Sequence, residues 1–349
     1  MPSIAKPLIP LAPLPKNDLG LTPRAYDGAM STLCAGCGHD SVTAALMQAL
    51  FELSIPPHKV AKLSGIGCSS KTTAYFASDA HGFNSVHGRM PTIATGANAA
   101  NRDLHYIGVS GDGDSLSIGL GHLAHAVRRN VRMLYVIDNN GVYGLTKGQF
   151  SASADVGSTA KKGEANAFAP IDPLQMALSI GATFVARGFS GDKERLVPML
   201  KAGLSHRGLA LIDVISPCVQ FNDHEGSTKS YKYVRQHEVS ASDFVEPRET
   251  IRAHVPDEGT LTIPLHDGTE MTFRAVPEGF DPKDRAAAMA YLQERHAAGE
   301  VVTGLVYADD TVPDLHELSR TPEVPLAAVP YDRLCPGSDK LAELQAGFR

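Results

Sequence analysis

The chain has 349 residues, of which 43% are hydrophobic and 20% are charged, a composition typical of globular proteins. The net charge of −6 and the absence of a basic run argue against nucleic acid as the main partner. No apolar run reaches the ~20 residues needed to span a bilayer, so no membrane partner is expected. A chain of this length can bury one large core and a second, smaller one.

The N-terminal segment from Met1 to Lys16 is apolar but is interrupted by five prolines. It lacks the basic start and the uninterrupted hydrophobic stretch of a signal peptide, which predicts a cytoplasmic protein. We expect residues 1–30 to form an extended arm on the surface or on a neighbouring subunit.

Residues 31–235 alternate between predicted strands and predicted helices. The expected strands are residues 60–66, 104–109, 131–137, 183–187 and 209–215. The expected helices are residues 40–53, 87–100, 115–129, 173–181 and 192–204, and residues 151–169 form a long polar loop. This alternation is typical of an α/β domain with a doubly wound parallel sheet, the fold class that we predict.

The character of the chain changes near residue 236. Residues 260–263 and 271–274 are predicted strands that flank the turn sequence His266-Asp267-Gly268-Thr269, which indicates a hairpin. A helix over residues 281–298 and a strand over residues 301–307 follow, and the proline-rich end is expected to wrap a surface. We therefore predict an α+β extension, residues 236–349, that contacts a partner or the protein's own surface.

Two polar turns follow neighbouring strands of the predicted sheet. Gly111-Asp112-Gly113-Asp114 follows the strand over residues 104–109, and Asn139-Asn140-Gly141 follows the strand over residues 131–137. Parallel strands bring both turns to the carboxyl edge of the sheet, where open α/β sheets bind ligands. A carboxylate and an amide oxygen can share a hard cation there, and glycines allow a diphosphate to approach the backbone. The pattern predicts a magnesium–diphosphate site.

Plainer interpretations of the same residues exist. Asp112 and Asp114 could cap the following helix, and Asn140-Gly141 could form an ordinary turn. Because the two motifs occur together, the ligand site is favoured for Asp112 and Asn140. For Asp114, capping and ligand binding are equally consistent with the sequence.

Four of the five cysteines lie near the same predicted edge. Cys34 and Cys37 form a Cys-x-x-Cys pair, and Cys68 and Cys218 each follow a strand. An odd number of cysteines in a large chain argues against a disulfide framework. Four thiolates suit an iron–sulfur cluster or a structural zinc, which the spacing does not distinguish, and buried inert thiols are the alternative. Cys335 has no such context and is expected to be an unliganded thiol.

Residues 34–231 resemble the β subunit of the two-subunit 2-oxoacid:ferredoxin oxidoreductases. The segments that carry this resemblance are Cys34-Ala35-Gly36-Cys37-Gly38, Ser64-Gly65-Ile66-Gly67-Cys68-Ser69, His87-Gly88-Arg89, Gly111-Asp112-Gly113-Asp114, Asn140-Gly141-Val142-Tyr143-Gly144-Leu145-Thr146-Lys147-Gly148-Gln149 and Pro217-Cys218. Their order and combination are highly specific and cover more than half of the chain. The usual family motif has proline where Ala35 stands, a departure that leaves the thiols in place.

The resemblance implies thiamine diphosphate, Mg²⁺ and one [4Fe-4S] cluster as cofactors. The implied ligands of Mg²⁺ are Asp112, the Asn140 side chain and the Val142 carbonyl. The implied ligands of the cluster are Cys34, Cys37, Cys68 and Cys218. The other implied cofactor-binding residues are Gly111, Gly113, Asp114, Gly144 and Leu145.

The resemblance also implies oxidative decarboxylation of a 2-oxoacid with coenzyme A, giving acyl-CoA, carbon dioxide and reduced ferredoxin. The long tail and the segment Phe221-Asn222-Asp223-His224 look like the members that convert 2-oxoglutarate to succinyl-CoA, while pyruvate and branched-chain 2-oxoacids are alternatives. In the family, the α subunit supplies the other half of the thiamine site, and no second thiamine-type module is evident here. We therefore expect an obligate assembly with an α subunit, either αβ or α2β2.

Candidate catalytic residues on the substrate side are Lys71, His87, Arg89 and Lys147. The two lysines lie on loops at the predicted site and could meet a carboxylate or a phosphate, with solvated surface lysines as the alternative. His87 and Arg89 could contact cofactor or substrate, or could form a packed, hydrogen-bonded pair.

Two other classes of function are compatible with these motifs. One is a non-oxidative thiamine decarboxylase or carboligase subunit whose cysteines hold zinc or nothing. The other is a non-catalytic interaction subunit that keeps the sheet without turnover. A brown colour that dithionite bleaches would favour the iron–sulfur cluster over zinc, and reconstitution with an α subunit would test for turnover.

Overall fold

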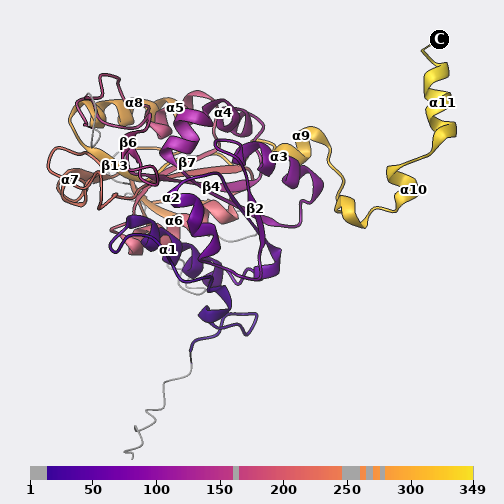
Figure 1. Cartoon of the computed structure of the whole chain (residues 1–349), viewed down its shortest axis with the longest axis horizontal. Coiled ribbons are helices and arrows are strands. Elements are labelled where there is room, and N and C mark those ends of the chain that lie inside the picture. Colours follow the sequence, from indigo (N-terminus) through magenta and orange to yellow (C-terminus); the bar gives the residue numbers. More distant parts are fainter. Residues whose placement is uncertain (1–13, 160–164, 246–259, 265–269, 276–279, 349) are drawn as a thin grey trace, which may run out of the picture.

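The computed structural model describes residues 14–159, 165–245, 260–264, 270–275 and 280–348, and its centre is an eight-stranded sheet (Figure 1). The strands lie in the order β2 (His81–Asn84), β1 (Val60–Ser64), β3 (His105–Gly111), β4 (Met133–Asn139), β8 (Leu209–Ile215), β7 (Phe184–Phe189), β13 (Val301–Ala308) and β9 (Glu238–Ser240). From β2 to β7 every neighbouring pair is parallel, whereas β13 runs antiparallel to β7. The α/β fold is confirmed, with a sheet that is mostly rather than wholly parallel.

Helices cover both faces of this sheet. One face is packed by α1 (Gly38–Glu52) and α6 (Lys193–Ser205). The other face is packed by α3 (Met90–Ala100), α4 (Leu120–Arg128), α5 (Pro173–Ser179) and α8 (Arg285–Ala297). No helix in the described part of the chain is long and apolar enough to cross a membrane.

The strands are apolar on both sides because each side faces a separate core. In β4, Tyr135 and Ile137 belong to the core under α3 and α4, whereas Leu134 and Val136 belong to the core under α1 and α6. Alternate strand residues point to opposite faces, so a central strand must be apolar throughout. This is why the short apolar runs in the sequence predicted these strands well.

The helix predicted over residues 115–129 is wrong in its first half. Gly113–Ile118 forms a π-helical turn, η4, and a regular helix begins only at Leu120. Gly119 separates the two, and a Cβ atom there would lie 2.6 Å from the Asp114 carbonyl oxygen and 2.9 Å from Gly88 Cα. The close packing of Gly119 on Gly88 interrupts the regular helix, and single π turns of this kind occur frequently at functional sites.

The predicted C-terminal extension is partly continuous with the main sheet. Its strands β9 and β13 pair with each other, and β13 also pairs with β7. The predicted strands around residues 260 and 271 are confirmed as the antiparallel pair β11 (Thr260–Pro264) and β12 (Glu270–Ala275), which β10 (Ser242–Val245) extends. Residues 265–269, which include the predicted turn, lie outside the described residues.

Beyond α9 (Leu315–Ser319) the chain leaves the body as an arm of short helices, with α10 at Tyr331–Leu334 and α11 at Ser338–Ala346 (Figure 1). No described side chain between residues 321 and 348 is buried. The exposed side chains of this arm include Tyr331, Leu341 and Leu344. The arm therefore covers no surface of its own body.

The start of the described chain is tied to the body through one buried tyrosine. Asn17 Nδ2 donates a hydrogen bond to the Tyr26 hydroxyl (2.8 Å), which in turn donates to the Ile55 carbonyl (3.0 Å). Tyr26 has no exposed surface. Residues 1–13 of the predicted arm lie outside the described residues.

Candidate functional site

Four neighbouring strands end at one edge of the sheet. β1 leads to the short helix α2 (Cys68–Lys71), β3 leads to Asp112, β4 leads to Asn140 and β8 leads to Cys218. The register aligns these ends, since Gly111 of β3 pairs with Asp138 of β4, and Asn139 pairs with Ile215 of β8. The polar turns and the strand-end cysteines therefore lie together, as parallel strands require.

Asp112 is buried, with a relative exposure of 1%, and its two carboxylate oxygens have different surroundings. Oδ2 accepts hydrogen bonds from Gly141 N (3.0 Å), Ser153 Oγ (2.7 Å) and Ser151 Oγ. Oδ1 has one long contact among the described residues, 3.4 Å from Asn140 N. Because an oxygen has two lone pairs, Oδ2 is saturated and Oδ1 is available to a cation. Burial raises the pKa of Asp112, although the two serines oppose this shift.

Asn140 is held by contacts to its backbone and to its side chain. Its carbonyl accepts a hydrogen bond from Asn222 Nδ2 (2.8 Å), and its Oδ1 accepts one from Val142 N (3.1 Å). Gly141 adopts a φ of +76°, and a Cβ atom there would lie 2.8 Å from Asn222 Nδ2. Glycine is therefore required at this position both by conformation and by packing. The turn fixes the Asn140 amide oxygen, and Asn140 and Val142 line the same cleft as Asp112. Amide and carbonyl oxygens are ligands that Mg²⁺ accepts.

Asp114 joins three segments of the chain. Its Oδ1 accepts hydrogen bonds from Gly88 N (2.8 Å) and Ile66 N (3.4 Å), and its Oδ2 accepts one from Ser110 Oγ (2.7 Å). Neither oxygen makes a capping bond to the following turn, so the capping alternative for Asp114 is wrong. A buried carboxylate with three donors stabilises the loops around the site.

These residues line a small cleft of about 50 Å³. Its lining includes His39, Ile66, Gly67, Ser69, His87, Gly111, Asp112, Gly113, Asp114, Asn140, Val142, Tyr143, Gly144 and Leu145. The Ser69 hydroxyl is buried there without a hydrogen-bond partner among the described residues, as expected where a ligand supplies the missing acceptor or donor. Among the wider cavities lined by described residues, one of about 650 Å³ adjoins the cleft and shares Ile66, Gly67 and Leu145 with it. Another, of about 530 Å³, shares no lining residue with the cleft.

Gly113 is explained by packing against a tyrosine. A Cβ atom on Gly113 would lie 2.4 Å from the Tyr143 ring, and the Tyr143 hydroxyl donates a hydrogen bond to the Gly113 carbonyl (3.0 Å). The sequence predicted that this glycine admits a diphosphate. In the structure, the direction in which a side chain would project is filled by Tyr143.

Four cysteines gather beside the cleft. A Cβ atom on Gly144 would lie 3.5 Å from the sulfur atoms of both Cys68 and Cys218, so these sulfurs are at most twice that distance apart. The loop that carries Cys34 and Cys37 packs on the segment after β8, since Gly38 N donates to the Pro217 carbonyl (3.4 Å). Cys335 lies exposed on the C-terminal arm.

The four thiols are close enough to influence one another electrostatically. Burial raises the pKa of Cys37 to about 12, and Cys68 and Cys218 add to that shift. Burial also raises the pKa of Cys68 and of Cys218. Among the described residues, however, no three His, Cys, Asp or Glu side chains converge closely enough to bind one metal ion together. The thiols therefore lie around a shared region without the tight tetrahedral spacing of a structural zinc site.

Known proteins are similar to the part of the chain that forms this edge of the sheet. Residues 65–214 match the model of the thiamine pyrophosphate enzyme C-terminal TPP binding domain. The chain is 42% identical over 215 residues to the 2-oxoacid:ferredoxin oxidoreductase subunit beta of Saccharolobus solfataricus, a match that covers 61% of this chain and 70% of that protein. The chain belongs to the 2-oxoacid:ferredoxin oxidoreductase β-subunit family.

Two further members of this family are similar to the chain. The 2-oxoglutarate oxidoreductase subunit KorB of Mycobacterium tuberculosis is 42% identical over 191 residues, which span 54% of this chain and about half (51%) of that relative. A solved 2-oxoglutarate:ferredoxin oxidoreductase from Magnetococcus marinus, with 2-oxoglutarate, coenzyme A and succinyl-CoA bound, superimposes with a TM-score of 0.74 at 30% identity. That superposition covers 94% of this chain and 97% of the solved chain.

The four candidate catalytic residues of this family member lie at different distances from the cleft. His87 lines the cleft itself, and Lys71 lines the adjoining cavity of about 650 Å³, where its Nζ donates to the Thr32 carbonyl (3.4 Å). Arg89 Nη1 donates to the His87 backbone carbonyl (3.2 Å), and His87 is exposed, so this contact is not the packed side-chain pair that the sequence offered as an alternative. Lys147 is exposed on the loop between β5 (Val142–Tyr143) and β6 (Gln149–Phe150), with a φ of +80°.

The buried pair of His39, which lines the cleft, and Asp138 was not singled out by the sequence. His39 Nδ1 lies 2.6 Å from Ser216 Oγ and 3.7 Å from Asp138 Oδ2, and its Nε2 lies 3.5 Å from Asn140 Nδ2. Burial lowers the pKa of His39 to about 4 and raises that of Asp138 well above its usual range. Burial therefore disfavours the charged forms of both side chains. The only signal in the sequence was that both residues adjoin recognised motifs.

Proposed function

We propose that this chain is the β subunit of an enzyme that oxidatively decarboxylates a 2-oxoacid with coenzyme A and passes the electron pair to ferredoxin. The observation that carries this proposal is the meeting of two ligand sets at one sheet edge. Asp112 and Asn140 lie on one side, and the cysteines around Gly144 lie on the other. If electrons are removed one at a time from the decarboxylated substrate, a one-electron carrier must lie close to the reacting carbon.

The preferred substrate in this proposal is 2-oxoglutarate, which would give succinyl-CoA and carbon dioxide. The mycobacterial relative is named a 2-oxoglutarate oxidoreductase, and the solved neighbour carries 2-oxoglutarate and succinyl-CoA. Other relatives are named only for 2-oxoacids, so pyruvate is the competing substrate to test.

Mg²⁺ is proposed to bind Asp112 Oδ1, the Asn140 side chain and the Val142 carbonyl. Bound thiamine diphosphate supplies the carbanion chemistry that decarboxylation requires. The chain's own part is to hold the metal and the diphosphate, to keep Oδ1 of Asp112 free and to exclude water by burial. The unpaired Ser69 hydroxyl supports a polar ligand in this cleft.

A [4Fe-4S] cluster is proposed to bind Cys34, Cys37, Cys68 and Cys218. When bound, such a cluster supplies one-electron transfer. Three of these thiols have raised pKa values, so they are protonated at neutral pH and lose their protons as metal binds.

Residues 31–235 are proposed to hold both cofactors, and an α subunit is proposed to complete the thiamine site. A cleft of about 50 Å³ has room for an ion and part of a diphosphate but not for a whole cofactor, which supports a half-site. The arm formed by residues 321–348 buries nothing against its own body, which supports a partner-binding role for the end of the extension. Deleting the arm from the full complex should weaken assembly and leave the sheet folded.

Lys71, His87, Arg89 and Lys147 are proposed to serve the substrate side of the same site. Lys71 and His87 line adjoining cavities, which supports contact with a carboxylate or a phosphate. Arg89 would act by holding His87, and Lys147 would act from the exposed loop.

Reconstitution of the chain with its α subunit tests the proposed function. The complex should reduce ferredoxin with 2-oxoglutarate and coenzyme A faster than with pyruvate, and the isolated chain should be inactive. Carbon dioxide release without ferredoxin reduction would instead favour the non-oxidative alternative.

A further inference from the structure

A continuous chain of buried polar groups leads from Asp112 toward another cavity of the protein. Ser153 Oγ lies 2.7 Å from Asp112 Oδ2 and 2.8 Å from Asn139 Oδ1. Asn139 Nδ2 donates to Asp213 Oδ1 (2.9 Å), and Arg187 Nε donates to Asp213 Oδ2 (2.7 Å). Every member of this chain is less than 9% exposed.

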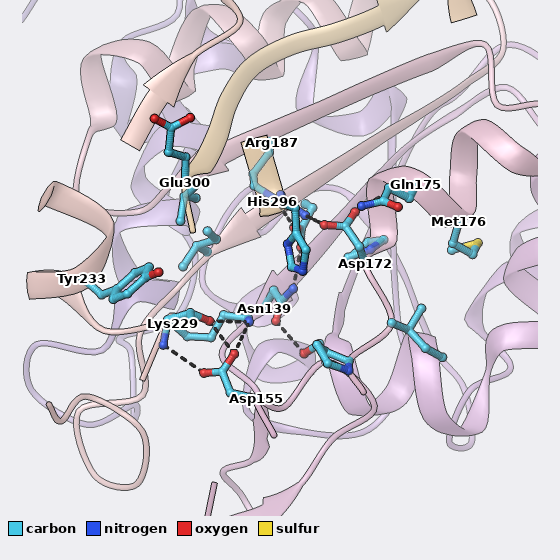
Figure 2. Close-up of a pocket in the computed structure, with 18 of the residues that line it drawn as sticks. Asn139, Asp155, Asp172, Gln175, Met176, Arg187, Lys229, Tyr233, His296 and Glu300 are labelled. Atoms are coloured by element: carbon cyan, nitrogen blue, oxygen red, sulfur yellow. Dashed lines mark hydrogen bonds and ion pairs between the residues drawn. The ribbon is translucent and has the colours of Figure 1, made fainter. Parts of the chain in front are cut away.

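The far end of the chain is anchored to a helix. Arg187 Nη2 donates to Asp172 Oδ2 (2.8 Å), and Asp172 Oδ1 accepts from Leu174 N and Gln175 N at the start of α5. These groups line a cavity of about 530 Å³, where Figure 2 shows Asn139 between the Arg187–Asp172 pair and the Lys229–Asp155 pair. Because these lining charges are paired with one another, the cavity itself does not indicate a ligand.

The orientation of the Asn139 amide follows from its partners. Asp213 is a carboxylate that already accepts from Arg187, so it requires a donor from Asn139, which is the NH₂ group. The Asn139 carbonyl oxygen must then face Ser153. The Ser153 hydroxyl has one proton for two acceptors, Asn139 Oδ1 and Asp112 Oδ2, and sharing this proton fixes Ser153 Oγ between them.

We propose that Asn139, held by Asp213 and Arg187, is a positioning residue that acts through Ser153 on the magnesium ligand Asp112. Ser153 and Gly141 saturate Oδ2 together with Ser151, so the carboxylate cannot rotate without losing several hydrogen bonds. Oδ1 is thereby presented to the cation. A fixed carboxylate favours Mg²⁺, which demands near-ideal octahedral geometry, over the larger and more tolerant Ca²⁺. This inference rests on the proposed magnesium site.

A double-mutant cycle in the α/β complex tests it, with metal affinity measured by calorimetry in the presence of thiamine diphosphate. Ser153→Ala and Asn139→Ala should each weaken Mg²⁺ binding ~10-fold, the range found for groups that orient a metal ligand. The double variant should also lose only ~10-fold, because Asn139 acts through Ser153. The preference for Mg²⁺ over Ca²⁺ should fall in all three.

The control removes another buried hydroxyl far from the site. Thr183 Oγ1 contacts Asn130 Oδ1 and His206 Nε2, each at 2.8 Å, near the start of β7. Thr183→Val should lower stability without changing the metal preference. The inference would be overturned if the double variant lost Mg²⁺ affinity by the product of the two single losses. It would also be overturned if Asn139→Ala bound Mg²⁺ with unchanged affinity. Failure of the wild-type complex to bind Mg²⁺ with thiamine diphosphate would instead overturn the proposed function.

Discussion

A Cβ atom on Gly65 would lie 1.9 Å from Oδ2 of Asp114, closer than two unbonded atoms can approach. Gly65 follows β1, and Asp114 lies in the π turn after β3. The segment that leads to Cys68 is therefore packed directly on the carboxylate that joins the loops of the cofactor cleft. This contact joins the segment that carries Cys68 to the turn that carries Asp112 and Asp114.

Substitution of Gly65 tests this contact. Gly65→Ala should destabilise the complex by about 1–3 kcal/mol, because the added methyl group overpacks a site with a fixed carboxylate. Gly96→Ala is the matched control, since Gly96 lies in α3 with open space around its Cα. That control variant should have a free energy of unfolding about 0.5–1 kcal/mol higher than wild type, the usual gain when alanine replaces a helical glycine. Chemical unfolding of both variants measures the difference, and equal effects would contradict the contact.

Asp112 and Asp114 are expected to respond differently to the same change. Asp112→Asn should weaken Mg²⁺ binding by more than ~100-fold, since a direct ligand matters more than the groups that orient it. Asp114→Asn should lower the free energy of unfolding by about 1–3 kcal/mol, because an NH₂ group would then face the donors that Asp114 now accepts. Metal titration and chemical unfolding of both variants separate the two roles. The assignment fails if Asp112→Asn binds Mg²⁺ normally.

Asn222 is expected to affect metal binding although it lies far from Asn140 in sequence. Asn222→Ala removes the donor to the Asn140 carbonyl at a buried turn, so the free energy of unfolding should fall by about 1–3 kcal/mol. The Mg²⁺ affinity should fall ~10-fold. The neighbouring Asp223 accepts from Tyr231 N at the start of α7 (Tyr231–His237), outside the turn. Asp223→Ala should therefore leave Mg²⁺ affinity unchanged, and equal losses in both variants would indicate a general loop effect.

The cysteines divide into four proposed ligands and one control. Replacing any one of the four proposed ligands with serine should lower the iron content of the anaerobically purified complex and slow ferredoxin reduction. These variants are Cys34→Ser, Cys37→Ser, Cys68→Ser and Cys218→Ser. Cys335→Ser should leave both unchanged, because Cys335 is exposed on the arm. Iron that persists undiminished in the four variants would place the cluster elsewhere in the complex.

The strands and the approximate place of the site were predictable because both follow from local patterns. β8 (Leu209–Ile215), for example, is apolar at every position except Asp213, and all seven of its residues are buried. Parallel strands then dictate that Asp112, Asn140 and Cys218 meet at one edge. The antiparallel addition of β13 was not predictable in this way, since the choice of sheet edge depends on tertiary packing.

The surroundings of Asp114 and of the proposed metal ligand Asp112 required the structure. Asp114 is held by donors from Ile66, Gly88 and Ser110, which lie in separate segments of the sequence. Ser151 and Ser153 lie in a loop without periodicity, so no pattern marked them as partners of Asp112. Hydrogen-bond partners that are distant in sequence leave no local signal.

The central claim is that the thiamine half-site and the electron carrier share this chain. The most direct test adds 2-oxoglutarate and coenzyme A, without ferredoxin, to the oxidised α/β complex and follows the visible absorption. We expect about four iron atoms per chain and bleaching of the cluster in the wild-type complex, with both lost in Cys218→Ser. Undiminished bleaching in Cys218→Ser, or a wild-type complex whose absorption does not change, would contradict it.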